Sequence, residues 1–214
     1  MSVESDVQSG AHAAAEPAPA PAAAGNPALL GLMTFLPSGI TLGLWFVGYL
    51  DTATLGGGMI PAVTLSAGLF QLVAASYALR AGASTVAAIF GVFSAFWLSF
   101  GLLLAGLTSG WWGITEAAAV AEVQSAYLLS FLIVFVILTL GTLRLPLAFT
   151  VGFVLVCITF ALAFLGVSTG NAGLFPIAGI STFLFCAVFA YILLDGLGQD
   201  LGGKAMPMGN AMVK

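Results

Sequence analysis

The residues of this chain that could bind a solute lie where its first apolar stretch begins, at Asn26 and Pro27. An asparagine is favoured just before a helix, because its side chain accepts a hydrogen bond from a free N–H of the first turn. Proline suits the first helical position, where no N–H is needed. The remaining free N–H groups and the helix dipole attract anions without any cationic side chain. The pattern therefore indicates either an anion-attracting mouth or an ordinary helix cap.

The apolar stretches that follow contain no Lys, Arg, Asp, Glu or His, and this absence limits their chemistry. A proton relay, an intramembrane enzyme and a metal site would each need such side chains at membrane depth. Cys157 and Cys186 are isolated and indicate apolar packing, while His12, the only histidine, lies in the N-terminal tail. We therefore expect no catalysis, no cofactor and no metal, and we expect Asp195, at the end of the last stretch, to be solvated.

A few uncharged polar side chains remain that could line a path for a solute. Gln71 is the most notable of them, because an amide buried in lipid needs a partner. It indicates either a pore-lining group or an interhelical hydrogen bond worth ~1 kcal/mol. The other members of this group are Thr34, Ser38, Thr41, Ser94 and Asn171.

Six apolar stretches must position these residues, and they determine the fold class. About 20 apolar residues in a helix span the hydrocarbon core of a bilayer, and within lipid the helix satisfies its own backbone groups. The composition, 61% hydrophobic and 6% charged, agrees with an all-α membrane protein of six transmembrane helices. The predicted spans are Leu29–Leu50, Met59–Leu79, Ser84–Leu107, Ala126–Leu143, Leu145–Val167 and Gly173–Leu194.

The basic residues predict how these spans are oriented. Arg80, Arg144, Lys204 and Lys214 all fall on the side of the termini, whereas the opposite side carries only acidic residues. By the positive-inside rule both termini are cytoplasmic. The sequence thus divides into a disordered Ala- and Pro-rich cytoplasmic tail (1–25), a six-helix membrane domain (26–195) and a cytoplasmic C-terminal tail (196–214).

The loops predict two further features. The longest, 106–125, carries Trp111 and Trp112, which suit the membrane interface, and its run Glu116–Glu122 is helix-prone and predicts a short surface helix. The net charge of −4 gives no reason to expect a nucleic-acid partner, and the apolar spans make the lipid bilayer the expected partner.

Several motifs in order along the chain resemble the acetate/succinate transporter family of the YaaH type. The first is Asn26-Pro27-Ala28-Leu29-Leu30-Gly31-Leu32, which opens the first span and is followed by Phe35 and by Gly48-Tyr49. The others are Ala67-Gly68-Leu69-Phe70-Gln71, Phe96-Trp97-Leu98, Gly141-Thr142-Leu143-Arg144, Gly170-Asn171 and Pro207-Met208-Gly209. The resemblance covers residues 26–209.

This resemblance implies a function and a set of pore residues. It implies a hexamer of six-helix protomers in the cell (plasma or inner) membrane, each with its own path for acetate, and for succinate in some members. The narrow point of that path would be formed by Phe35, Phe93 and Val156. The remaining candidates for solute contact come from the matching motifs, and they are Asn26, Pro27, Leu30, Gly31, Gln71 and Asn171.

The missing intramembrane charges favour a channel-like path over a tightly coupled pump. An anion that enters a cell against a membrane potential of ~100 mV does so at a free-energy cost of about 2.3 kcal/mol per charge. A solute that carries its own proton avoids this cost. A dry constriction favours this neutral acid, because stripping water from a carboxylate costs far more. Two alternatives stay open: a channel for a neutral solute such as urea, ammonia or glycerol, and a non-transporting membrane scaffold, although no large soluble domain is present.

Overall fold

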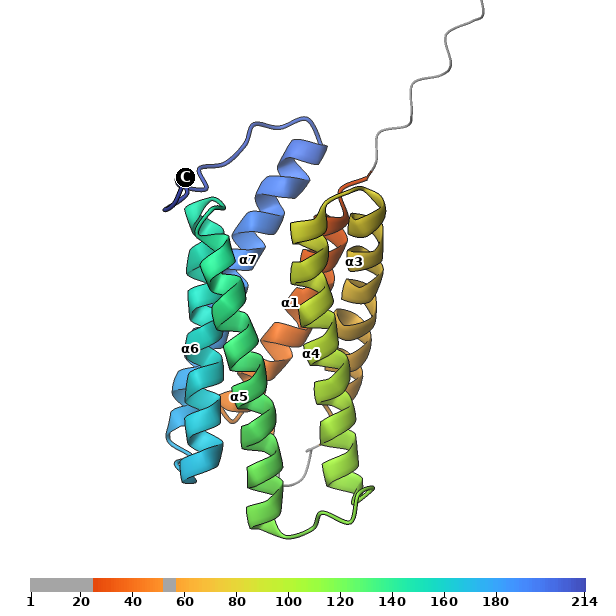
Figure 1. Cartoon of the computed structure of the whole chain (residues 1–214), viewed down its shortest axis with the longest axis vertical. Coiled ribbons are helices and arrows are strands. Elements are labelled where there is room, and N and C mark those ends of the chain that lie inside the picture. Colours follow the sequence, from red (N-terminus) through yellow and green to blue (C-terminus); the bar gives the residue numbers. More distant parts are fainter. Residues whose placement is uncertain (1–24, 52–56) are drawn as a thin grey trace, which may run out of the picture.

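The protein is a bundle of helices that run roughly along its long axis, and Figure 1 shows their arrangement. The structure, a computed structural model, describes residues 25–51 and 57–214. Within these ranges no strand occurs, and six helical segments are long and apolar enough to cross a membrane, as predicted. The elements are α1 (Pro27–Phe46), η1 (Ala62–Leu69), α3 (Phe70–Arg80), α4 (Ser84–Ser109), α5 (Ala117–Thr142), α6 (Leu147–Thr169) and α7 (Leu174–Asp200).

Helix α1 lies at the centre of the bundle and connects its two halves. On one side it contacts η1 and α3, which pack on α4, and on the other side it contacts α7, which packs on α6 and through it on α5. The start of α1 and the C-terminus of the chain lie at the same end, called here the terminal end (Figure 1). The opposite end, where α4 is joined to α5, is called the loop end. Helices α4 and α5 approach each other only sparsely along their lengths.

The packing of α1 depends on glycines that face both halves. A Cβ on Gly31 would overlap the Phe90 ring of α4, and a Cβ on Gly39 would lie 2.6 Å from Cys186 Sγ of α7. Small residues at these positions let the neighbouring helices approach closely. The close fit places the inward face of α1 against both halves of the bundle at once.

The second span is not one regular α-helix, as the apolar pattern had predicted, but a π-helix followed by α3. Ser38 of α1 accounts for part of this difference. Its Oγ donates to Ala62 O at 2.8 Å and accepts from Ala67 N at 3.0 Å. These backbone groups are five residues apart, which is the spacing of a π-helical hydrogen bond. The serine therefore lies between two groups of η1 that would otherwise bond each other.

Two boundaries also differ from the sequence predictions. The run Glu116–Glu122 does not form a separate surface helix, because from Ala117 onward it is the first part of α5. Helix α7 continues to Asp200, six residues beyond the predicted end of its apolar stretch. In both cases the helix includes charged residues that the sequence prediction had placed outside the membrane span. The predicted disordered tail lies almost wholly in residues 1–24, outside the described part of the chain.

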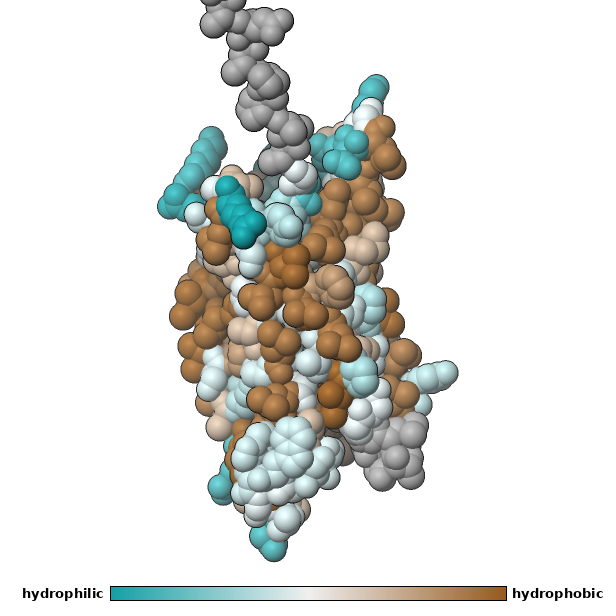
Figure 2. Space-filling view, turned by 90° about the vertical axis from the view of Figure 1, so that its right-hand side faces the viewer, coloured by the Kyte–Doolittle hydropathy of each residue, from teal (hydrophilic) through white to brown (hydrophobic). Residues whose placement is uncertain are grey.

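The outer surface is that of a multi-pass membrane protein. In Figure 2 hydrophobic side chains cover the middle of the face shown, and hydrophilic ones gather towards the two ends. Helix α5 contributes most to the apolar exterior, since of its 26 residues only Phe135 and Thr142 are buried. Its exposed side chains include Ile133, Ile137 and Leu140. This helix offers a broad apolar face to lipid or to another protomer.

Candidate functional site

Two cavities enter the bundle, and their walls share no residue. The terminal cavity, of about 230 Å³, is bounded by α1, α3, α4, α6 and α7, and its wall includes Asn26, Phe35, Gln71, Phe93 and Asp195. The loop cavity, of about 510 Å³, is bounded by α1, α4, α5, α6 and α7. Its wall is mainly aromatic, with Trp45, Phe46, Phe96, Phe100, Tyr127, Phe160 and Phe175.

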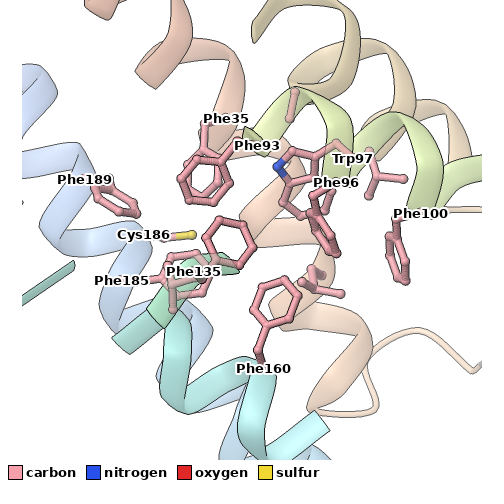
Figure 3. Packing of buried hydrophobic residues seen from close by; sticks show 14 of the residues in the cluster. Phe35, Phe93, Phe96, Trp97, Phe100, Phe135, Phe160, Phe185, Cys186 and Phe189 are labelled. Atoms are coloured by element: carbon pink, nitrogen blue, oxygen red, sulfur yellow. The ribbon is translucent and has the colours of Figure 1, made fainter. Parts of the chain in front are cut away.

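A cluster of buried rings, called here the aromatic layer, separates the two cavities. It consists of Phe35, Phe93, Phe96, Trp97 and Phe135, none more than 5% exposed. The Phe93 ring, in the wall of the terminal cavity, lies 4.8 Å from that of Phe135, between ring centroids. Phe135 in turn lies 6.3 Å from Phe96, in the wall of the loop cavity. Figure 3 shows these rings between α1, α4 and α7. A solute that crossed from one cavity to the other would have to pass between them.

The structure brings together two of the three residues expected at the narrow point. The rings of Phe35 and Phe93 meet edge-on with centroids 5.2 Å apart. Val156 is 1% exposed and belongs to the same hydrophobic cluster, but it lines neither cavity. On α6 it follows Phe153, in the wall of the terminal cavity, by three residues and precedes Phe160, in the wall of the loop cavity, by four. Helical spacing therefore puts Val156 at the depth of the aromatic layer.

Asn26 has the geometry of a helix cap at the mouth of the terminal cavity. Its Oδ1 accepts a hydrogen bond from Ala28 N at 3.0 Å, and Pro27 occupies the first turn of α1. Asn26 is exposed and belongs to the cavity wall, whereas Pro27 and Leu30 do not. Leu30 instead packs on a small cluster that contains Phe90. Only the asparagine of this first turn thus both caps the helix and faces the cavity.

Gln71 is held deep in the terminal cavity with one half of its amide unpaired. It is 1% exposed, and its Nε2 donates a long hydrogen bond of 3.4 Å to the carbonyl oxygen of Gly31. Its Oε1 is buried without a partner. Because the carbonyl can only accept, Nε2 must face Gly31, and the free atom must be the acceptor. Gly31 itself lines neither cavity. Its carbonyl oxygen positions the Gln71 amide, and its lack of a side chain leaves room for the Phe90 ring.

Asn171 lies away from both cavities, at an exposed turn between α6 and α7. Its Oδ1 accepts from Gly173 N at 3.1 Å, which organises the start of α7. The remaining polar candidates are bonded to backbone carbonyls rather than free. Thr34, Ser38, Thr41 and Ser94 donate to Leu30 O, Ala62 O, Pro37 O and Gly68 O respectively. None of the four is among the residues that line the cavities.

Asp195 was missed by the sequence analysis, and the expectation that it is solvated is wrong. It is 8% exposed and forms part of the wall of the terminal cavity. It is buried because α7 does not end at Leu194 but continues to Asp200 and is covered by the C-terminal segment. The sequence does contain a signal for this burial, because residues at helical spacing continue one face of the helix past the charge. These residues are Phe185, Phe189, Ile192, Gly196 and Gln199.

Thr159 in the loop cavity was also missed. It is 2% exposed, and its hydroxyl has no hydrogen-bond partner. A helical threonine usually bonds the carbonyl four residues earlier, here Leu155 O. That carbonyl already accepts from Ser181 Oγ of α7 at 3.0 Å, as well as from the helix backbone. The occupied carbonyl explains why the Thr159 hydroxyl is left over beside the cavity.

The electrostatics of the two cavities are similar. Among the described residues, each wall contains one carboxylic acid, Asp195 in the terminal cavity and Asp51 in the loop cavity. Neither wall, as far as the described residues form it, contains a Lys, Arg or His. A carboxylate anion in either cavity would thus meet an acidic group and, among the described residues, no cation to offset the loss of its water.

Comparisons with known proteins agree with this arrangement. A family model described as the GPR1/FUN34/YaaH family matches residues 9–200. The solved structure described as that of the bacterial acetate channel SatP is similar to this chain, with 27% sequence identity and a TM-score of 0.75. The similarity covers 86% of this chain and 99% of that one. A search of curated proteins gave no match. Since the family model covers most of the sequence and the resemblance of its motifs is thereby confirmed, this six-span membrane protein belongs to the GPR1/FUN34/YaaH family.

Proposed function

We propose that this protein is a channel-like facilitator for acetate and similar small monocarboxylic acids. The route runs through each protomer, from the terminal cavity past the aromatic layer into the loop cavity. The observation that carries this proposal is the pair of cavities that meet the same buried rings from opposite ends. The similarity to the bacterial acetate channel SatP supports the choice of acetate.

The aromatic layer favours a solute that crosses as the neutral acid. A constriction lined mainly by apolar rings bars hydrated ions but passes small solutes that shed their water easily. Stripping water from an ionised carboxylate costs far more than stripping it from a carboxylic acid. The described residues of both cavity walls include no basic side chain, which supports the same conclusion.

Two groups in the terminal cavity suit this solute. The free Oε1 of Gln71 is an acceptor, and it can take a hydrogen bond from the O–H of a protonated acid but not from a carboxylate. Asn26, at the mouth, caps the start of α1, so the positive end of this helix dipole lies at the mouth of the cavity. The solute would first be attracted at Asn26 and then be desolvated beside Gln71, Phe35 and Phe93. Val156 would add a further apolar wall at this depth.

A channel for a small neutral solute, such as urea, ammonia or glycerol, is the second candidate. The lining of the cavities favours it, because their described residues include no cation that would select a carboxylate. A catalytic role is disfavoured, since we find no nucleophile with an activating base among the residues that line the cavities. Passage of succinate, an oligomer of six protomers and cytoplasmic termini remain part of the proposal.

Uptake of radiolabelled acetate by the purified protein in liposomes tests the proposal. Uptake should exceed that of protein-free liposomes, be inhibited by propionate and be insensitive to excess urea or glycerol. Acetate uptake no faster than in protein-free liposomes, together with protein-dependent uptake of urea or glycerol, would favour the second candidate instead. Native mass spectrometry under mild conditions should show a hexamer, and a monomer alone would count against that assembly.

A further inference from the structure

Asp195 is an acidic side chain placed inside the proposed route. It belongs to the wall of the terminal cavity, together with Asn26 and Gln71, and is 8% exposed. The helices fit tightly at this point, since a Cβ on the neighbouring Gly196 would lie 2.7 Å from Leu29 Cδ2. Helix α7 thus lies directly against α1 beside the carboxylate. Any solute in the terminal cavity is therefore near this group.

Both oxygens of Asp195 accept hydrogen bonds from uncharged donors. Met206 N donates to Oδ1 at 2.6 Å, and Gln199 Nε2 donates to Oδ2 at 2.7 Å. Among residues 25–51 and 57–214, Asp195 forms no ion pair with a basic side chain, so its negative charge is not neutralised there. These two donors match the two acceptor oxygens of a carboxylate.

The C-terminal segment, residues 201–214, fixes the donor that Met206 supplies. It runs from the end of α7 across the terminal end towards α5 and α6, as Figure 1 shows. Tyr191 Oη donates to Pro207 O at 2.8 Å, Ala148 N donates to Met208 O at 3.0 Å, and Met212 N donates to Leu143 O at 3.0 Å. The segment is thus fastened to all three helices of this half of the bundle. The position of the Asp195 carboxylate is fixed on both sides, by its own helix and by this segment.

We infer that Asp195 is a charge filter in the terminal cavity, which admits uncharged solutes and opposes anions, dicarboxylates most strongly. A fixed negative charge repels a monoanion and repels a dianion about twice as strongly at the same distance. It leaves a neutral acid or amide of the same shape almost unaffected. Asp195 would then select solutes by their charge, whereas the aromatic layer would select them by their size. The inference rests on the proposed function, because it requires that solutes pass through this cavity.

The experiment varies charge and length at this one position in the full-length protein. Asp195→Asn and Asp195→Gln remove the charge at two side-chain lengths, and Asp195→Glu keeps the charge at the longer one. Asp200→Asn is the matched control, since Asp200 is an exposed acid on the same helix and lies outside the cavity. Each protein is placed in liposomes at neutral pH, and uptake of succinate is compared with that of acetamide, the uncharged analogue of acetate.

We expect the succinate-to-acetamide ratio to rise at least fivefold in both neutral variants. It should stay within twofold of the parent in Asp195→Glu and in Asp200→Asn. A ratio that follows side-chain length instead of charge, or that changes in none of the variants, would overturn the inference. The use of two neutral variants guards against the misfolding of one. If the parent protein carried neither acetate nor acetamide, the proposed function would fail and this inference with it. If the parent protein transports acetate and acetamide but the succinate-to-acetamide ratio is unchanged in the variants, only this inference is wrong.

Discussion

Phe35 of α1 and Phe93 of α4 meet edge-on at the inner end of the terminal cavity, with ring planes at 66°. Phe35 also lies 5.3 Å from Phe189 and 5.8 Å from Phe185 of α7, between ring centroids. One side chain of the central helix therefore contacts rings from both halves of the bundle. If the halves separate to let a solute through, these contacts must open first.

Replacing Phe35 by alanine should open the barrier. We expect Phe35→Ala to increase acetate flux in liposomes and to admit larger monocarboxylates such as butyrate, because the ring no longer fills the space beside Phe93. Phe185→Ala is the control, since Phe185 is equally buried and contacts Phe35 but lines neither cavity. A folded Phe35→Ala protein with parental flux and parental solute range would show that the residue only contributes packing.

Two threonines of α6 should respond oppositely to loss of their hydroxyl groups. Thr150 Oγ1 donates to Thr142 O at 2.9 Å, and its replacement by valine should lower the free energy of unfolding by ~1 kcal/mol. The Thr159 hydroxyl has no partner, so Thr159→Val should leave stability unchanged or raise it slightly. Thermal unfolding in detergent measures both. Equal destabilisation of the two variants would mean that Thr159 is hydrogen-bonded after all.

Substitution of Asn26 separates its capping role from a role at the cavity mouth. Aspartate caps helices as well as asparagine does and interacts well with the helix dipole, so Asn26→Asp should unfold at the parental temperature. At neutral pH acetate reaches the mouth mostly as the anion and is protonated before it crosses, so the added charge should repel it there and slow its uptake markedly. Uptake of acetamide, which is never charged, should be nearly unchanged. Asn26→Ala, which lacks the cap, should lose ~1 kcal/mol of stability. If the Asn26→Asp protein takes up acetate at the parental rate, Asn26 is a helix cap and has no role in transport.

Cysteine labelling tests the predicted orientation. After replacement of Cys157 and Cys186, single cysteines at Ser109 and Ala205 should react with an impermeant reagent from opposite sides of the membrane. Both positions are exposed, and they lie near the loop end and in the C-terminal segment respectively. We expect Ala205 to be reached only from the cytoplasm, because all four basic residues share its side. Labelling of both cysteines from one side would refute this orientation.

The sequence predicted the spans well because lipid imposes a simple rule on length and hydrophobicity. It also predicted the cap at Asn26 and the contact between Phe35 and Phe93, the former from local chemistry and the latter from the family resemblance. It did not predict the π-helix, which depends on Ser38, a residue of another span. Nor did it predict the free hydroxyl of Thr159, which depends on Ser181 of α7.

Asp195 shows why charged residues at span ends are hard to interpret from sequence. An acid that follows an apolar run is usually solvated, and here the segment that buries it comes later in the chain and has no regular secondary structure. A hydropathy pattern contains no information on such a contact. The helical spacing of its neighbours on α7 was the one signal that could have placed it inside.

The central claim is that a small monocarboxylic acid crosses the aromatic layer without its charge, and voltage tests this most directly. Acetate uptake into proteoliposomes is measured at equal internal and external pH, with and without a membrane potential of ~100 mV. A unit charge would gain or lose about 2.3 kcal/mol across that potential, whereas a neutral acid would gain nothing. We expect the protein-dependent uptake to be the same at both voltages and to fall as the pH is raised and the neutral acid becomes scarcer. Uptake that changes severalfold with the sign of the potential would show that the anion itself passes and would contradict the account.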